Sequence, residues 1–275
     1  ERMIAVLTRL AGASVRAALV AAMIVLPAIV LPEISHNAAD LAILSAAIAA
    51  AFVVFEYGFT TPSLIEFRFA APYNRIRFAL LALLLTGIAF AFRGPVEQTA
   101  TTIAVSSFAV TSASIWEFTG SPLMFFNGMT KELDAEGRLL LSNAAALSLS
   151  LTVLALIVFS AVIWMFHWPL KARNFNLRVN MPNFDSNVGV ETQQILRQSA
   201  LVNMIIGLSL PFLIPQAALT FMGPLEPISS TNSLLLLWMI AIWCFVPAAS
   251  ILRSIALYKV ATLINEMNLD EDQDA

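Results

Sequence analysis

The chain has 275 residues, of which 59% are hydrophobic and 12% charged, with a net charge of −3 and a mean hydropathy of +0.81. Soluble domains usually carry about 25% charged residues. The composition therefore excludes an ordinary water-soluble domain and predicts an all-α fold, a polytopic transmembrane helical bundle in which lipid is the main solvent. No nucleic-acid partner is predicted. The single cysteine, Cys244, excludes a disulfide within the chain and a thiolate metal cluster.

Six apolar stretches are long enough to cross the hydrocarbon core, which takes about 20 residues of helix. These predicted spans lie at about 15–32, 40–59, 76–93, 139–166, 199–222 and 233–258 of a single integral-membrane domain. Before the first span, Arg2, Arg9 and Arg16 recur every seven residues and share one helical face. We therefore expect either an amphipathic lead-in at the interface or a long first helix with its base among the headgroups. The acidic tail, 265–275, is expected to be solvated.

The distribution of basic residues decides how the chain is oriented and whether Gln98–Phe118, a stretch rich in Ser and Thr, also crosses. If it does not cross, the outer side carries three basic residues, Arg93, Lys131 and Arg138, and the cytoplasmic side the remaining twelve of the 15. If it does cross, the division is eight against seven. Because cytoplasmic segments carry the excess of Lys and Arg, we predict six spans with both termini cytoplasmic, seven spans being the alternative.

Residues 94–138 then form an extracytoplasmic segment. A helix lying along the interface or a re-entrant hairpin packed on other helices satisfies its backbone groups, whereas an open loop in lipid does not. In either case Glu117 is expected to face water; in a seventh span it becomes a candidate for ion or proton binding.

The longest polar connection, 168–198, is predicted to be cytoplasmic. Apolar and polar residues alternate over 175–181, which favours a short strand or extended segment that needs a partner for its apolar face. Asn183, Asp185, Asn187 and Glu191 resemble a calcium loop, but Gly189 comes one place late and Gln194 replaces the closing acid. Turn and capping roles are therefore predicted, and no metal site.

The predicted spans contain few groups that could carry chemistry. Glu56, His167 and Arg253 lie near the inner ends of spans and are expected to reach the headgroups by snorkelling. The two histidines, His36 and His167, lie too near the ends of spans to ligate a haem between helices. No nucleotide-binding, zinc-protease or serine-hydrolase motif is present in the sequence. No catalytic residue and no cofactor is predicted, and an enzyme is the less favoured class.

Two groups of residues are candidate sites. The first is the charged elbow between the second and third spans, with Glu56, Glu66, Arg68, Arg75 and Arg77. Its arginines are expected to face headgroup phosphates and its acids to pair with these arginines, as an anchor or as a docking surface for a partner subunit. The second is a possible broken-helix solute site with Asn203, Pro211, Pro215 and Gln216, the alternative being that both prolines only kink the helix.

The second span is rich in alanine, with small pairs such as Ala46 and Ala50 or Ala47 and Ala51. Small faces allow helices to approach closely, so this span is expected either at the centre of the bundle or against a neighbour, including self-association. The predicted function is a non-catalytic integral subunit, a scaffold, assembly or accessory component, of a larger complex in a bacterial inner membrane. Its partners are the lipid bilayer and other membrane subunits. A transporter or channel for a small or lipid-like solute is the alternative, and an interfacial lipid-acting enzyme the third.

Overall fold

The computed structural model describes residues 2–58, 65–67, 71–166, 168, 190–229 and 231–273, with side chains from residue 6 in the first helix, from 192 onward after the second gap, and up to 264 at the end. Every regular element in these ranges is a helix. Six of these helices are long and apolar enough to cross a membrane. The predicted fold class, an all-helical polytopic membrane bundle, is confirmed.

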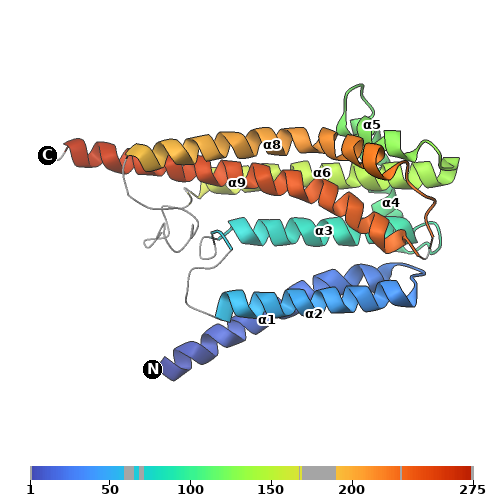
Figure 1. The fold of residues 1–275 in the computed structure, drawn as a ribbon, viewed down its shortest axis with the longest axis horizontal. Coiled ribbons are helices and arrows are strands. Elements are labelled where there is room, and N and C mark those ends of the chain that lie inside the picture. Colours follow the sequence, from blue (N-terminus) through green and yellow to red (C-terminus); the bar gives the residue numbers. More distant parts are fainter. Residues whose placement is uncertain are drawn as a thin grey trace.

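The six long helices run back and forth along the long axis of the molecule (Figure 1). They are α1 (Arg2–Val30), α2 (His36–Gly58), α3 (Tyr73–Arg93), α6 (Ala135–Met165), α8 (Val190–Met222) and α9 (Ser233–Gln273). The start of α1 and the end of α9 lie at the same end of this axis, called here the terminal end, and the opposite end is the far end. Because α1 is one continuous helix from Arg2, the arginine-bearing N-terminal stretch is the base of a long first helix and no separate lead-in.

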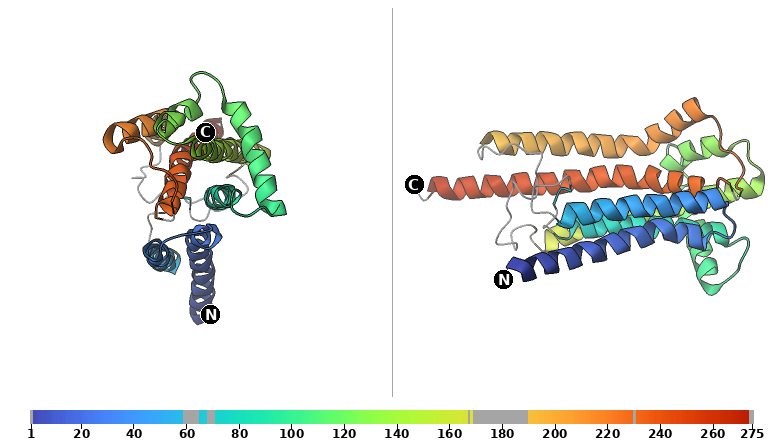
Figure 2. Two further views of the ribbon diagram at one scale, coloured as in Figure 1. Left: turned by 90° about the vertical axis from the view of Figure 1, so that its right-hand side faces the viewer. Right: turned by 60° about the horizontal axis from the view of Figure 1, so that its bottom comes forward.

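Three short helices gather toward the far end: α4 (Ala100–Trp116), α5 (Pro122–Asn127) and the 3₁₀ turn η1 (Gly128–Thr130). The 17 residues of α4 extend about 25 Å, short of a full crossing. Figure 2 shows α4 running across the bundle while the long helices are seen end-on. A capping box at Thr99 starts α4, and the Trp116 indole N–H donates to Ser150 Oγ of α6 at 3.0 Å. Helix α4 therefore lies across the long helices, and the location of segment 94–138 on the outer side, as an interfacial helix or a re-entrant hairpin, stays a prediction.

The main hydrophobic core lies where α3, α6 and α9 meet. Leu84, Leu85 and Ile88 of α3 are fully buried there, and so is the alanine run 144–146 of α6. Alanine has no side chain beyond Cβ, so the three helices approach closely. A second core lies nearer the terminal end, where large aromatic and aliphatic side chains meet: Phe67, Tyr73, Phe159, Trp168, Leu196 and Leu257.

Helices α1 and α2 form a hairpin at the periphery of the molecule (Figure 2). The residues buried along the hairpin include Ala13 and Ala17 of α1 and Ala42 and Ala46 of α2, so small side chains allow these two helices to pack together. Helix α1 continues the contact to α3. The alanine-rich second span is therefore not central to the bundle. Of the two alternatives the structure shows the second, because buried small residues of this span pack against the neighbouring helix α1.

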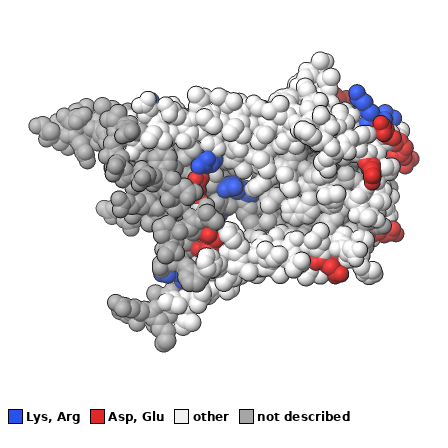
Figure 3. All heavy atoms as spheres, in the orientation of Figure 1, with Lys and Arg blue, Asp and Glu red and all other residues white. Residues whose placement is uncertain are grey.

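Charged side chains gather toward the two ends of the long axis on the face seen in Figure 3, with an uncharged band between them. The spacing along α3 is informative, because Arg77 and Arg93 are 16 residues apart, or about 24 Å. The hydrocarbon core of a bilayer is about 30 Å thick, and arginines reach outward from inside its edge. Arg77 and Arg93 therefore fit positions near the two headgroup levels.

Candidate functional site

The charged elbow lies at the terminal end, between α2 and α3. Phe67 is buried in the second core, with its ring centroid 4.8 Å from that of Tyr73 and 5.7 Å from that of Trp168. Its backbone has a φ of 54°, which is uncommon for a bulky residue. The Asn74 side-chain amide donates to the carbonyls of Glu66 and Phe67, at 2.9 and 3.2 Å. These contacts fix the backbone from which the Glu66 side chain extends.

Glu66 binds Arg253 of α9 through two parallel hydrogen bonds. Arg253 Nε donates to Oε2 and Nη2 to Oε1, each at 2.7 Å, the fork geometry that makes arginine–carboxylate pairs strong. Arg253 Nη1 also donates to Asn203 Oδ1 of α8 at 3.3 Å. Of the two side chains, Glu66 is 15% exposed and Arg253 38%. The pair therefore ties the elbow to the last two long helices.

This pairing differs from the sequence-based expectation in two ways. Glu66 was expected to pair with the arginines of the elbow itself, and Arg253 to extend alone to the headgroups. The Glu66 side chain extends from the elbow toward α9. Because α9 runs antiparallel to α3, its C-terminal half lies beside the elbow, and Arg253 is close enough to pair with Glu66. An arginine inside a long apolar span is costly without a partner, so Arg253 was the signal that could have identified this pair.

Arg77 lies between two cavities. Its guanidinium carbon is 5.3 Å from the centroid of the Tyr73 ring and 5.9 Å from that of Phe245, within the range of cation–π attraction. One cavity, of about 590 Å³, is bordered by Glu66, Arg253 and Asn203. The other, of about 850 Å³, lies among α1, α2 and α3.

The structure brings some of the predicted elbow residues together and leaves others apart. Arg75 is exposed and lines the larger cavity with Arg77, whereas Glu66 and Arg77 line the smaller one. Glu56 is buried on α2 and lines neither cavity. Arg68 lies outside the described residues, as does most of the 168–198 connection, with its predicted extended segment and most of the acidic and amide residues that resemble a calcium loop.

The second candidate site is not assembled. Helix α8 continues through Pro211 and Pro215, without separation into two half-helices. Gln216 is exposed and lies 13 residues from Asn203 on that helix, or about 20 Å. Asn203 belongs instead to the ion-pair network around Arg253.

The prolines form part of the contact between α8 and α9. Pro215 has no N–H, so the carbonyl four residues earlier, that of Pro211, lacks its helical partner. The indole N–H of Trp243 in α9 donates to this carbonyl at 2.9 Å. One turn of α8 away, Gly207 lies against Pro247 and Ile251 of α9. These residues therefore stabilise a helix crossing.

A double-mutant cycle tests this role for Trp243. Trp243→Phe is expected to lower the free energy of unfolding by about 1–2 kcal/mol, because it leaves a partly buried carbonyl without a donor. Pro215→Ala restores the helical N–H, so about 1 kcal/mol of that loss should disappear in its presence. Unfolding in detergent at increasing sodium dodecyl sulfate measures both costs. Trp238→Phe on the same helix is the control, and an equal cost of Trp243→Phe in both backgrounds contradicts the contact.

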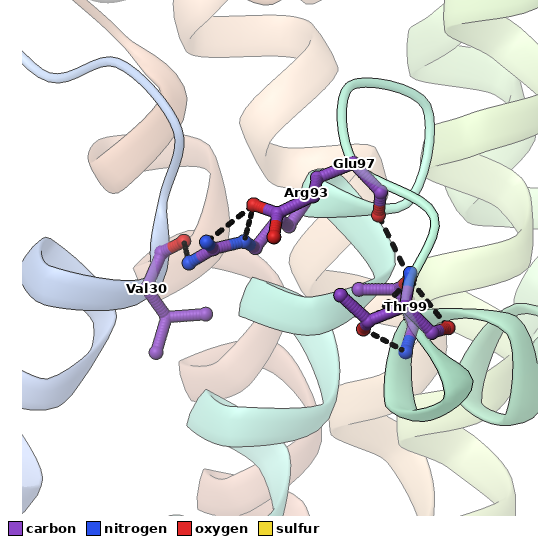
Figure 4. A network of polar contacts seen from close by, with 5 residues as sticks. Val30, Arg93, Glu97 and Thr99 are labelled. Atoms are coloured by element: carbon purple, nitrogen blue, oxygen red, sulfur yellow. Dashed lines mark hydrogen bonds and ion pairs between the residues drawn. The ribbon is translucent and has the colours of Figure 1, made fainter.

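A separate polar network joins α1 to α3 at the far end (Figure 4). Arg93 Nη1 donates to the Val30 carbonyl at 3.1 Å, and Arg93 also pairs with Glu97. The Glu97 carbonyl accepts from Thr102 Oγ1 at 2.8 Å, next to the capping box of Thr99. These groups hydrogen-bond to one another, and the bond from Arg93 to the Val30 carbonyl links the C-terminal ends of two helices, α3 and α1.

Other possible chemical groups lie apart. Glu117 is exposed at the C-terminal end of α4, so it faces outward and not into the bundle. Cys244 is buried in the main core. Among the residues that the structure describes, no three His, Cys, Asp or Glu side chains are grouped closely enough to hold a metal ion.

The fold and the site define an all-helical, multi-pass membrane protein. Comparison of the chain with protein-family models, with curated proteins and with solved structures finds no match.

Proposed function

We propose that the protein is a non-catalytic integral subunit, a scaffold, assembly or accessory component, of a larger complex in a bacterial inner membrane. The observation that carries this proposal is the α1–α2 hairpin. Its two helices pack on each other and α1 also packs on α3, while α2 has an outward face that includes exposed Ala47 and Ala51. Exposure alone would equally suit lipid. The small size of these residues favours a helix partner, because close helix approach requires small side chains and acyl chains do not.

Purification in mild detergent tests the proposal. A second protein is expected to co-purify at a fixed ratio, and Ala47→Leu combined with Ala51→Leu is expected to release it. The same change at two exposed alanines elsewhere, Ala104→Leu in α4 with Ala217→Leu in α8, is the matched control and should retain it. Thermal unfolding should show that both double variants remain folded. A pure monomer, or an oligomer of this chain alone, contradicts the proposal.

The second candidate, a carrier for a lipid-like solute, is favoured by one observation. The cavity of about 850 Å³ has mainly apolar walls with arginines among them. The enzymatic alternative relied on the elbow acids, and Glu66 is bound by Arg253. Transfer of labelled lipid between leaflets of reconstituted vesicles would identify a carrier, whereas a subunit leaves that rate unchanged.

A further inference from the structure

We propose that the larger cavity, among α1, α2 and α3, is a binding site for one anionic phospholipid, with its phosphate among Arg16, Arg75 and Arg77. The cavity has a volume of about 850 Å³, within the usual range for ligand sites. It is separate from the proposed partner face, because Val53, which lines the cavity, is rotated about 200° around α2 from Ala51.

The positive charge of the cavity comes from two helices. Arg16 belongs to α1, and Arg75 and Arg77 belong to the first turns of α3. No carboxylate is among the described residues that line the cavity. Glu66 borders the adjoining smaller cavity and is bound by Arg253. A cavity lined by three arginines and by no described carboxylate favours the binding of an anion.

Two of the three arginines, Arg16 and Arg77, are held by contacts within the protein before a ligand arrives. Arg16 Nη1 donates to the Gly12 carbonyl at 2.8 Å, and its guanidinium carbon lies 4.9 Å from the centroid of the Tyr57 ring. Arg77 packs against Tyr73 and Phe245, and its Nε atom is buried without an acceptor among the described residues. A buried donor without a partner is costly, and a phosphate oxygen supplies the missing acceptor. A guanidinium presents several N–H groups in a planar fork that matches phosphate.

The backbone adds to this attraction. Ala71, Asn74 and Arg75 of the α3 start also line the cavity. The first turn of a helix carries partial positive charge and unpaired N–H groups, which favours an anion there.

The remaining walls favour a lipid over a soluble anion. Val15, Leu19 and Val20 of α1 line the cavity together with Phe78 of α3, and apolar surface of this kind suits an acyl chain. The arginines lie near the headgroup level deduced from the spacing along α3. A zwitterionic headgroup would bring an ammonium group to a site that has three arginines and no lining acid. An anionic headgroup with a single negative phosphate is therefore the class expected.

Lipid titration of the delipidated full-length protein, followed by native mass spectrometry, tests the site. Phosphatidylglycerol is expected to bind with a ratio of one and at least about tenfold more tightly than phosphatidylcholine with the same chains. Each arginine near a membrane surface contributes about fivefold to anionic lipid binding. Arg75→Gln combined with Arg77→Gln should therefore weaken phosphatidylglycerol binding roughly 25-fold, and Arg16→Gln about fivefold.

Arg9→Gln is the matched control, because Arg9 is exposed on the same helix as Arg16 but does not line the cavity; its effect should stay under about twofold. If the double variant does not fold, the comparison of Arg16→Gln with Arg9→Gln still tests whether phosphatidylglycerol binds in the cavity. Equal binding of the two lipids, or equal loss in Arg9→Gln and Arg16→Gln, overturns the proposal. Displacement of phosphatidylglycerol by millimolar inorganic phosphate also overturns it, in favour of a soluble anion.

Discussion

Replacement of Gly207 by valine is expected to lower the free energy of unfolding by about 3 kcal/mol or more, at the upper end of the range for overpacking. A Cβ atom at position 207 would lie 2.5 Å from Ile251 Cγ1, 2.9 Å from the Pro247 carbonyl oxygen and 3.1 Å from the Ile251 nitrogen. Two of these three atoms belong to the backbone of α9, so no side-chain rotation relieves the clash. The two helices must separate, and the contacts on either side of Gly207 weaken together.

Thermal unfolding in detergent and titration with sodium dodecyl sulfate measure this loss. Gly128→Ala is the matched control, because a Cβ atom there meets no atom within 4 Å and the residue already has helical dihedral angles. Its stability should remain within about 0.5 kcal/mol of the wild type. Unfolding of Gly207→Val at the wild-type temperature would show that α8 and α9 do not cross as closely as described.

Loss of the Glu66 charge is expected to cause the second-largest decrease in the free energy of unfolding. Glu66→Gln keeps the shape of the side chain but leaves Arg253 without its counter-charge. Removing one partner costs about 3–5 kcal/mol for a fully buried pair and little for an exposed one. The 15% and 38% exposures place this pair between those limits, so the expected loss is about 2 kcal/mol, measured by the same titration.

The double variant Glu66→Gln with Arg253→Gln separates pairing from local damage. It should be more stable than the sum of the two single losses predicts, by about 1–2 kcal/mol. Glu97→Gln is the control at the far end, because its pair with Arg93 is exposed and lies within one turn; it should cost under about 0.5 kcal/mol. Additive losses at Glu66 and Arg253 would mean that their contact contributes nothing to stability.

The sequence was sufficient for the fold class because membrane helices are specified by local composition. A long apolar stretch must satisfy its backbone groups internally, whatever else it contacts. The Ser- and Thr-rich stretch around residue 110 forms a helix of 17 residues, and its location on the outer side stays a prediction from the count of basic residues. These inferences required no knowledge of which helices are neighbours.

The candidate site could be predicted in part. The elbow residues were recognised from their charge, but the partner of Glu66 is Arg253, 187 residues later, and local spacing carries no information about such a pair. The prolines of α8 were likewise recognised from the sequence without the partner that they contact. Pro211 and Pro215 indicate an interrupted hydrogen-bond ladder, whereas the Trp243 indole that repairs it belongs to another helix. Both contacts depend on which helices are neighbours, and the sequence alone does not show this.

The distance along the chain between Glu66 and Arg253 has a consequence for biogenesis. Residue 66 leaves the ribosome long before residue 253, so the acid enters the membrane region without its counter-ion, and the second core around Phe67 lacks Leu252 and Leu257 at that stage. The ion pair between Glu66 and Arg253 can form only after α9 has been synthesised and inserted. A chain truncated before the last helix therefore lacks the counter-charge of Glu66 and the α9 side chains that complete the second core, Leu252 and Leu257.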